Sequence, residues 1–254
     1  LQWLAEASGK GGPRVVAVDS WGRDYLDIER ILASAPSSQA AFSFGKALAH
    51  MHDCGAAAWG APPAGYSGIS YFGPVPMDTG SWSTVAEYLA EGRLRPMVRI
   101  GMERGALDSG DMALTERVID ALPDILGAAA DDSPARVHGD LWSGNVMWTS
   151  TAADGSALRQ AEAVLIDPAA HGGHREEDLA MLQLFGMSYM QEILDGYRSA
   201  HPLKAGYAGR VALWQLYPIA GHCAFFGGHD DAAVFSHFGF GFKTLYLQIF
   251  FGNF

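Results

Sequence analysis

Two short runs near the start of the chain are rich in apolar and β-branched residues and predict β-strands. They are RVVAVD at 14–19 and DYLDIERI at 24–31, both bounded by Gly, Pro or polar residues. Later in the chain, apolar runs at 146–149 and 161–166 flank the turn residues Ala153-Asp154-Gly155 and predict a β-hairpin. A further short strand is expected at Arg136-Val137.

Apolar residues at intervals of three and four dominate much of the remaining sequence and predict helices. The predicted helices are residues 39–54, 84–103, 111–128 and most of 176–227, the last interrupted at Pro202 and near Gly206. Residues 1–7 are interpreted as the end of an amphipathic helix. Between 55 and 80 the chain is rich in Gly, Pro and aromatic residues, which is typical of either a packed surface excursion or a binding loop.

Strands and helices therefore separate along the chain, which favours an α+β fold over a doubly wound one. The Phe-rich tail at 235–254 includes Lys243, Asn253 and several glycines. We interpret it as a packed helix or an irregular cover over the core, because a membrane span needs ~20 predominantly apolar residues.

The 254 residues carry a formal net charge of −11, and no run of Lys and Arg occurs anywhere. Nucleic acid and anionic membranes bind clustered positive charge, so neither is an expected partner. An acidic protein that handles a polyanion needs a cation, which already suggests a metal ion. Cys54 and Cys223 lie far apart and outside any metal-ligand spacing, as expected for two reduced thiols in a cytoplasmic protein.

The segment Val137-His-Gly-Asp-Leu-Trp-Ser-Gly-Asn145 is the strongest candidate for chemistry. It places Asp140 and Asn145 five positions apart in a loop between two predicted strands, and Asp167 follows the second arm of the hairpin. Phosphoryl transfer needs a carboxylate that accepts a proton and oxygen ligands that hold Mg²⁺ against the phosphates. The same Asp-to-Asn spacing, with a metal-binding Asp downstream, occurs in the catalytic loop of protein kinases.

Each of these residues alone has an ordinary structural interpretation. A single Asp in a Gly-containing loop is usually a turn residue, an Asp before Pro often ends a strand, and His138 alone would usually be structural. The two spacings and the flanking strands together favour a kinase.

The motif HGDLWSGN at 138–145 resembles the fructosamine-3-kinase (ketosamine kinase) family, a branch of the aminoglycoside-phosphotransferase-like kinases. The resemblance runs from about residue 1 to residue 228, and Trp142-Ser143 separates this family from choline- and aminoglycoside-type kinases. Its other matches are Ile166–Met181, Arg93-Leu-Arg-Pro96, Tyr197 with His201-Pro-Leu203, Gln215-Leu-Tyr-Pro218, and His222 with Phe226-Gly-Gly228.

The resemblance implies a bilobal protein-kinase-like fold with ATP between the lobes. Residues 1–35 would be the remainder of the small lobe and the hinge, and residues 36–254 the helical lobe. The implied activity is transfer of phosphate from Mg-ATP to the 3-hydroxyl of a ketosamine, with a part in protein deglycation.

The resemblance also assigns roles to individual residues. Asp140 would be the catalytic base, and Asn145 and Asp167 the Mg²⁺ ligands. The remaining expected site residues are Trp142 as a platform for the sugar, the Glu29 carbonyl and Ile31 N–H at the adenine edge, and His138 and Asp178 as structural support.

The sequence begins after the point where this fold carries its Gly-rich loop and phosphate-binding Lys, so we expect a longer protein with residues before Leu1. Two alternatives remain at this point. One is a related kinase that acts on an aminoglycoside, choline or homoserine. The other is a non-catalytic nucleotide-binding module without the phosphate loop.

Overall fold

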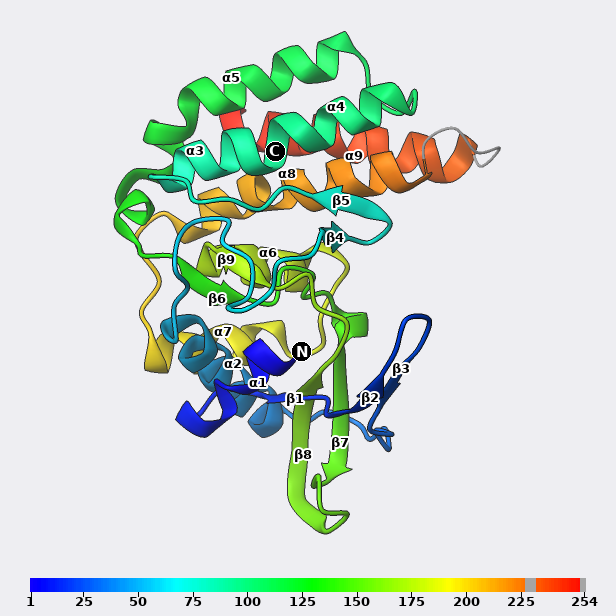
Figure 1. Ribbon diagram of the computed structural model, residues 1–254. Helices are drawn as coiled ribbons and strands as arrows, with labels where there is room; N and C mark the ends of the chain where they lie inside the picture. The colour runs from blue at the N-terminus through cyan, green and yellow to red at the C-terminus, as the bar shows by residue number, and fades with distance from the viewer. Residues whose placement is uncertain (227–231, 252–254) are drawn as a thin grey trace. The chain divides into compact units, whose positions relative to one another are not determined.

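The computed structural model describes the backbone of residues 1–226 and 232–251, and their side chains except those of 232–240 and 251. The chain divides into two compact units, each made of two separate segments (Figure 1). The first unit comprises residues 1–56 and 135–203, and the second comprises residues 57–134 and 204–254. The lobe boundary predicted near residue 35 stays a prediction.

The sheet of the first unit has the strand order β1-β8-β7. These strands are β1 (Arg14–Val15), β7 (Val146–Thr151) and β8 (Ala157–Leu165). β7 and β8 pair antiparallel as the predicted hairpin, and β1 adds to β8 in parallel. Two smaller antiparallel pairs are β2 (Val18–Trp21) with β3 (Leu26–Ile28), and β6 (Ala135–Val137) with β9 (His171–Gly173).

The helices of the first unit are α1 (Gln2–Ala5), α2 (Ser38–Asp53), α6 (Arg175–Leu184) and α7 (Met190–Ala200), with 3-10 turns η1 (Ser8–Lys10) and η4 (Ser143–Asn145). Helices α2 and α7 cross in close contact. A Cβ atom added at Gly45 would lie 1.9 Å from the carbonyl oxygen of Ile193, and one at Gly196 would lie 1.9 Å from that of Phe42. The crossing therefore requires glycine on both helices.

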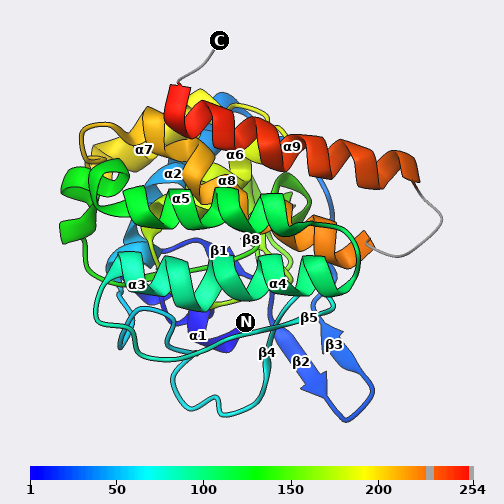
Figure 2. The ribbon, with the colours of Figure 1, turned by 90° about the horizontal axis from the view of Figure 1, so that it is seen from above.

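The second unit is mainly helical. Its elements are β4 (Ser70–Phe72), β5 (Val75–Met77), α3 (Val85–Leu89), a π-helical turn η2 (Ala90–Leu94), α4 (Arg95–Glu103), α5 (Ser109–Leu126), η3 (Gly127–Asp131), α8 (Tyr207–Phe226) and α9 (Ala232–Phe251). Figure 2 shows α4, α5 and α9 lying alongside one another as long neighbouring helices. Among the described residues, none of the helices combines the length and the apolar character that a membrane crossing requires.

Most predicted elements are confirmed, and the differences are local. The run at 14–19 divides between β1 and β2, and the loop at 55–80 contains the β4–β5 hairpin. The predicted helix at 84–103 is continuous but includes the π-helical turn. Residues 235–251 of the Phe-rich tail are helical in α9, where Phe242, Leu245 and Tyr246 are buried, and residues 252–254 lie outside the described residues.

Candidate active site

The loop with the motif HGDLWSGN connects β6 to β7 and is fixed at both ends. β6 pairs with β9, and β7 pairs with β8, so each end of the loop continues into a hydrogen-bonded strand. The last three residues of the loop form the turn η4. All of the loop lies within the first compact unit.

The structure brings Asp140, Asn145 and Asp167 together. The amide nitrogen Nδ2 of Asn145 lies 2.8 Å from the carbonyl oxygen of Asp140 and 3.2 Å from its carboxylate Oδ2. The same nitrogen lies 3.3 Å from the carbonyl oxygen of Asp167. Since these bonds all use the nitrogen of the buried amide, its oxygen Oδ1 is directed away from them. The Asp167 carboxylate also lies close enough for its charge to act on the Asp140 carboxyl.

Asp167 holds its place through an unusual backbone conformation. The N–H of Ile166 donates to the carbonyl oxygen of Asn145 at 3.1 Å, which ties the end of β8 to the loop. Asp167 then adopts a φ of 49°, in the left-handed region, directly before Pro168. A residue before proline prefers extended backbone, and a left-handed conformation costs of order ~1–3 kcal/mol outside glycine. Such strain is typical of functional sites.

The Asp140 carboxyl is held in an environment that opposes its ionisation. Burial, together with the negative charge of Asp167, raises the pKa of Asp140 to about 6, against a usual value of about 3.9. The hydrogen bond from Asn145 acts in the opposite direction but does not cancel these effects. A positive charge bound beside Asp140 and Asp167 would oppose both effects and favour the ionised form of Asp140.

A stability prediction follows from the raised pKa of Asp140. The folded protein binds this proton more tightly than the unfolded chain, so the free energy of unfolding falls as pH rises from about 4 through about 6. Asp140→Asn removes the titrating carboxyl and with it this fall in the free energy of unfolding. In a metal chelator, we expect the variant to exceed the wild type in stability at pH 7 by up to ~2 kcal/mol, with no such advantage at pH 4. Thermal unfolding at several pH values measures this, and parallel profiles would contradict it.

His138 and Asp178 fix the backbone of the loop that carries Asp140. Asp178 on α6 accepts the backbone N–H of His138 at 2.8 Å and that of Gly139 at 2.9 Å. Burial alone would raise the pKa of Asp178, but the hydrogen bonds from His52 and from the backbone N–H of His138 help to outweigh it, so that the pKa is lowered. The His138 ring contributes as well, with Nε2 lying 2.9 Å from the Ile166 carbonyl oxygen.

Gly139 is a site residue whose importance the sequence reasoning missed. Its φ of 81° is in the left-handed region, and a Cβ atom there would lie 2.3 Å from the carbonyl oxygen of Ala169. Any other residue would therefore be strained and would collide with backbone. The sequence did carry a sign of this, because Gly139 stands at the position where the protein-kinase pattern has Arg.

Trp142 exposes 39% of its surface beside the proposed base. One face of the indole is covered by backbone, because a Cβ atom at Gly144 would lie 2.2 Å from its six-membered ring. Phe185, at the end of α6, stands at 80° to the indole with the ring centroids 6.2 Å apart. Sequence reasoning did not select Phe185, which completes an aromatic corner with Trp142.

Glu29 and Ile31 lie in the irregular segment that follows β3. Nearby, the N–H of Ser34 donates to the Trp148 carbonyl oxygen at 2.8 Å, which fixes this segment beside β7. The Glu29 carboxylate pairs with Arg14 and accepts the N–H of Ala17. Within the described residues, the Glu29 carbonyl and the Ile31 N–H make no hydrogen bond, so both are available to a ligand.

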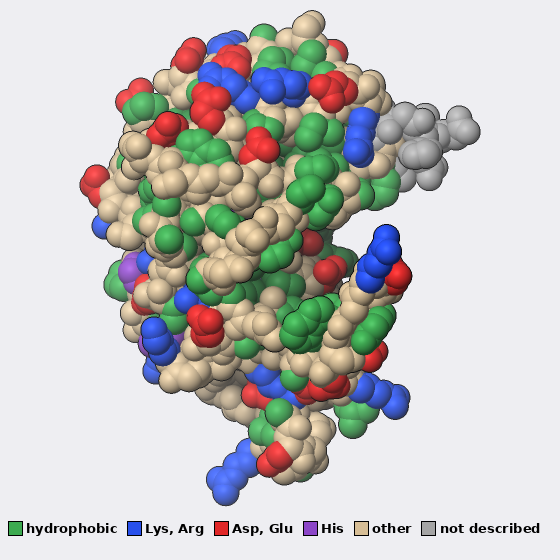
Figure 3. All heavy atoms as spheres, viewed as in Figure 1, with side chains coloured by type: hydrophobic (Ala, Val, Ile, Leu, Met, Phe, Trp, Pro, Cys, Tyr) green, Lys and Arg blue, Asp and Glu red, His purple; other side chains and the backbone are tan. Residues whose placement is uncertain are grey.

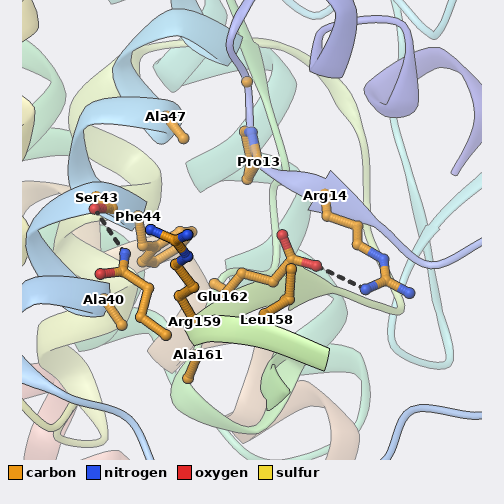
Figure 4. Close-up of a pocket in the computed structure, with 13 residues that line it drawn as sticks. Pro13, Arg14, Ala40, Ser43, Phe44, Ala47, Leu158, Arg159, Ala161 and Glu162 are labelled. Atoms are coloured by element: carbon orange, nitrogen blue, oxygen red, sulfur yellow. Dashed lines mark hydrogen bonds and ion pairs between the residues drawn. The ribbon is translucent and has the colours of Figure 1, made fainter. Parts of the chain in front are cut away.

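A separate cavity of about 330 Å³ lies beside α2, β1 and β8 in the first unit. Arg14 and Glu162 form an ion pair at this cavity (Figure 4), and the Gln160 side chain donates a hydrogen bond to the Ser43 hydroxyl. None of the predicted site residues lines it. On the face shown in Figure 3, Lys and Arg side chains are interspersed with Asp and Glu and form no continuous patch.

The chain has a kinase-like fold, as two solved structures show. A Thermobifida fusca protein whose crystal structure is named as that of a fructosamine-3-kinase is 40% identical, with a TM-score of 0.78 over 96% of this chain and 77% of its own. A microcompartment-associated aminopropanol kinase shares the fold at 15% identity, with a TM-score of 0.61 over 97% of this chain and 79% of its own. The predicted α+β fold of the kinase-like class is confirmed.

The sequence profile of the fructosamine kinase family matches residues 1–237. A Vibrio parahaemolyticus protein named as a probable ketoamine kinase is 32% identical over 235 residues, which are 90% of this chain and 73% of that protein. The chain therefore belongs to the fructosamine kinase family, and it is a kinase. Membership implies that ATP is the phosphate donor.

Proposed function

We propose that this kinase transfers the γ-phosphate of ATP to the 3-hydroxyl of a ketosamine, with Asp140 as the catalytic base. The observation that carries the proposal is the convergence of Asp140, Asn145 and Asp167 in one site of a chain from the fructosamine kinase family. The names of the relatives, ketoamine kinase and fructosamine-3-kinase, support the acceptor class.

Asp140 is suited to accept the proton of the attacking hydroxyl. Its pKa of about 6 makes it a stronger base than an ordinary carboxylate, yet it is mostly ionised at neutral pH. The bonds from Asn145 fix the loop backbone and the carboxylate together. Asp140 therefore orients the acceptor and removes its proton as the new P–O bond forms.

Asn145 and Asp167 are the proposed ligands of Mg²⁺. Carboxylate and amide oxygens are the donors that this ion prefers, and the charge of Asp167 acts with burial to raise the pKa of Asp140, an effect that a bound cation would oppose. When bound, Mg²⁺ neutralises and orients the phosphates. On the nucleotide side, the Glu29 carbonyl and the Ile31 N–H are the proposed partners of the adenine edge.

The aromatic corner of Trp142 and Phe185 is proposed to hold the sugar. An indole face packs well on the C–H face of a sugar, while hydroxyl groups remain free for the base. Holding one hydroxyl against Asp140 is most of what a kinase must do, because phosphoryl transfer depends chiefly on positioning.

A panel of acceptors tests the proposal with the full-length protein and Mg-ATP. We expect ketosamines to give a higher kcat/KM than free sugars, aminoglycosides, choline or homoserine. Turnover of an aminoglycoside or an amino alcohol in preference to ketosamines would overturn the acceptor while leaving the kinase assignment standing.

Trp142→Ala is expected to raise KM for the ketosamine by about tenfold at most, because one stacking contact is worth roughly 1 kcal/mol. ATP binding should not change, since the indole is proposed to contact only the acceptor. Steady-state kinetics with each substrate varied in turn measures both effects. An increase in KM for ATP alone would show that Trp142 belongs to the nucleotide site instead.

A further inference from the structure

A line of buried polar side chains continues from Asp178 away from the proposed site and has no part in the proposed chemistry. His52 on α2 lies with Nε2 3.0 Å from Asp178 Oδ2 and with Nδ1 2.8 Å from the hydroxyl of Tyr197 on α7. The Tyr197 hydroxyl in turn lies 3.0 Å from Nη1 of Arg175 on α6. Both His52 and Tyr197 are almost completely buried, and all of these residues belong to the first compact unit.

The chemistry of the four groups fixes the direction of every hydrogen bond. Asp178 accepts only, so His52 must donate from Nε2. Burial lowers the pKa of His52, which is therefore neutral and carries a lone pair on Nδ1. That lone pair accepts the Tyr197 hydroxyl proton, and the hydroxyl oxygen accepts from Arg175, which can only donate. Arg175 thus orients Tyr197, and the Tyr197 hydroxyl stabilises the His52 tautomer that donates to Asp178.

The tautomer of His52 matters for the loop that carries Asp140. Asp178 receives three donors, which are His52 Nε2 and the backbone N–H groups of His138 and Gly139. A His52 ring protonated on Nδ1 alone would turn a lone pair toward the carboxylate and repel it. Asp178 would then lose a buried hydrogen bond, and such a loss is energetically costly. Its hydrogen bonds to the backbone N–H groups of His138 and Gly139 would weaken as well.

We propose that Tyr197 and His52 are positioning residues that hold the catalytic loop through Asp178. The Tyr197 hydroxyl stabilises the His52 tautomer with hydrogen on Nε2, His52 donates from Nε2 to the Asp178 carboxylate, and the carboxylate accepts the two amides directly before Asp140. The expected effect on turnover rests on the proposed role of Asp140, whereas the effect on the loop does not.

Tyr197→Phe is the sharpest test, because it removes one oxygen and keeps the ring that packs between α2 and α7. We expect the amide hydrogens of His138 and Gly139 to exchange about tenfold faster with solvent, as measured by NMR. With Mg-ATP and the best acceptor, kcat should fall about tenfold while both KM values stay within about twofold, since loop geometry affects the transition state more than ground-state binding.

Tyr246→Phe is the matched control. Tyr246 is also buried, but its hydroxyl has no hydrogen-bond partner within the described residues. This variant should match the wild type in exchange at both amides and in kcat. It therefore separates the loss of a hydrogen bond in the network from the loss of any buried tyrosine hydroxyl.

His52→Gln and His52→Leu form a second pair. The glutamine amide can still donate to Asp178, whereas leucine fills a similar volume without a donor. We expect slow exchange of the His138 and Gly139 amides to persist in His52→Gln and to be lost in His52→Leu. Should His52→Leu fail to fold, Tyr197→Phe and His52→Gln still decide the matter.

Unchanged exchange at both amides in Tyr197→Phe would overturn the proposal, whatever happens to kcat. Equal exchange in the two His52 variants would overturn it as well. Because amide exchange needs no acceptor, the outcome is independent of the proposed function. If ketosamines are not turned over and the amides still respond, the acceptor assignment fails and the positioning role stands.

Discussion

Asp140→Asn is expected to lower kcat by ~10²–10⁴-fold, the usual cost of losing a general base. An amide cannot accept the proton of the attacking hydroxyl, although it can keep the hydrogen bond that Asn145 donates to Oδ2. Affinity for ATP should remain near that of the wild type, because the base contacts the acceptor and not the nucleotide.

Single-turnover kinetics and nucleotide titration on the same preparation separate these two effects. Asp120→Asn on the exposed face of α5 is a suitable control for the chemical change, and it should leave both quantities unaltered. An Asp140→Asn variant with full kcat would show that another group, or none, takes the proton.

Asp167→Asn is expected to remove most of the dependence of nucleotide binding on Mg²⁺. The wild-type protein should bind ATP well only when Mg²⁺ is present, since the acidic site otherwise repels the triphosphate. Loss of one carboxylate ligand should weaken Mg-ATP binding by at least about tenfold, in line with the cost of disturbing a metal site. Calorimetry with Mg²⁺ and with EDTA measures both proteins.

The same variant should also lower the pKa of Asp140 in metal-free protein, because the charge of Asp167 helps to raise it. NMR titration of the Asp140 carboxyl carbon provides this second readout. Equal affinity of wild-type protein for ATP in Mg²⁺ and in EDTA would contradict the proposed ligands. An unchanged pKa of Asp140 would contradict the electrostatic coupling.

The sequence was sufficient to predict that Asp140, Asn145 and Asp167 lie together, because these residues are local to two motifs. Asp140 and Asn145 share one loop, and the β7–β8 hairpin returns the chain so that Asp167 meets them. A hairpin with a clear turn signal fixes which residues at its two ends become neighbours. Spacing and turn chemistry were therefore sufficient to place these three residues together.

The residues that support the catalytic loop could not be predicted from the sequence in the same way. His52 and Asp178 are separated by 126 positions, and no periodicity or motif connects a histidine on α2 with an aspartate on α6. Their contact depends on how three helices pack. The contact of Phe185 with Trp142 could not be predicted either, because an aromatic residue at the end of a helix usually belongs to the core.

Parts of the fold were missed where packing overrides local preference. The π-helical turn η2 keeps Arg93 buried against the rings of Tyr88 and Tyr217, and helical periodicity alone predicts an ordinary α-helix there. The β4–β5 hairpin places Phe72 against Tyr217 and Phe225 of α8. Those partners lie far along the chain, so a loop prediction for residues 55–80 was the natural one.

The most direct test of the account is to identify the phosphorylated product. Wild-type protein is incubated with Mg-ATP and a fructosamine such as a glycated lysine derivative, and the product is analysed by correlated phosphorus and proton NMR. We expect one new phosphate ester coupled to the proton on carbon 3 of the sugar, and almost none with Asp140→Asn. An ester at another position, or equal yield from Asp140→Asn, would contradict it.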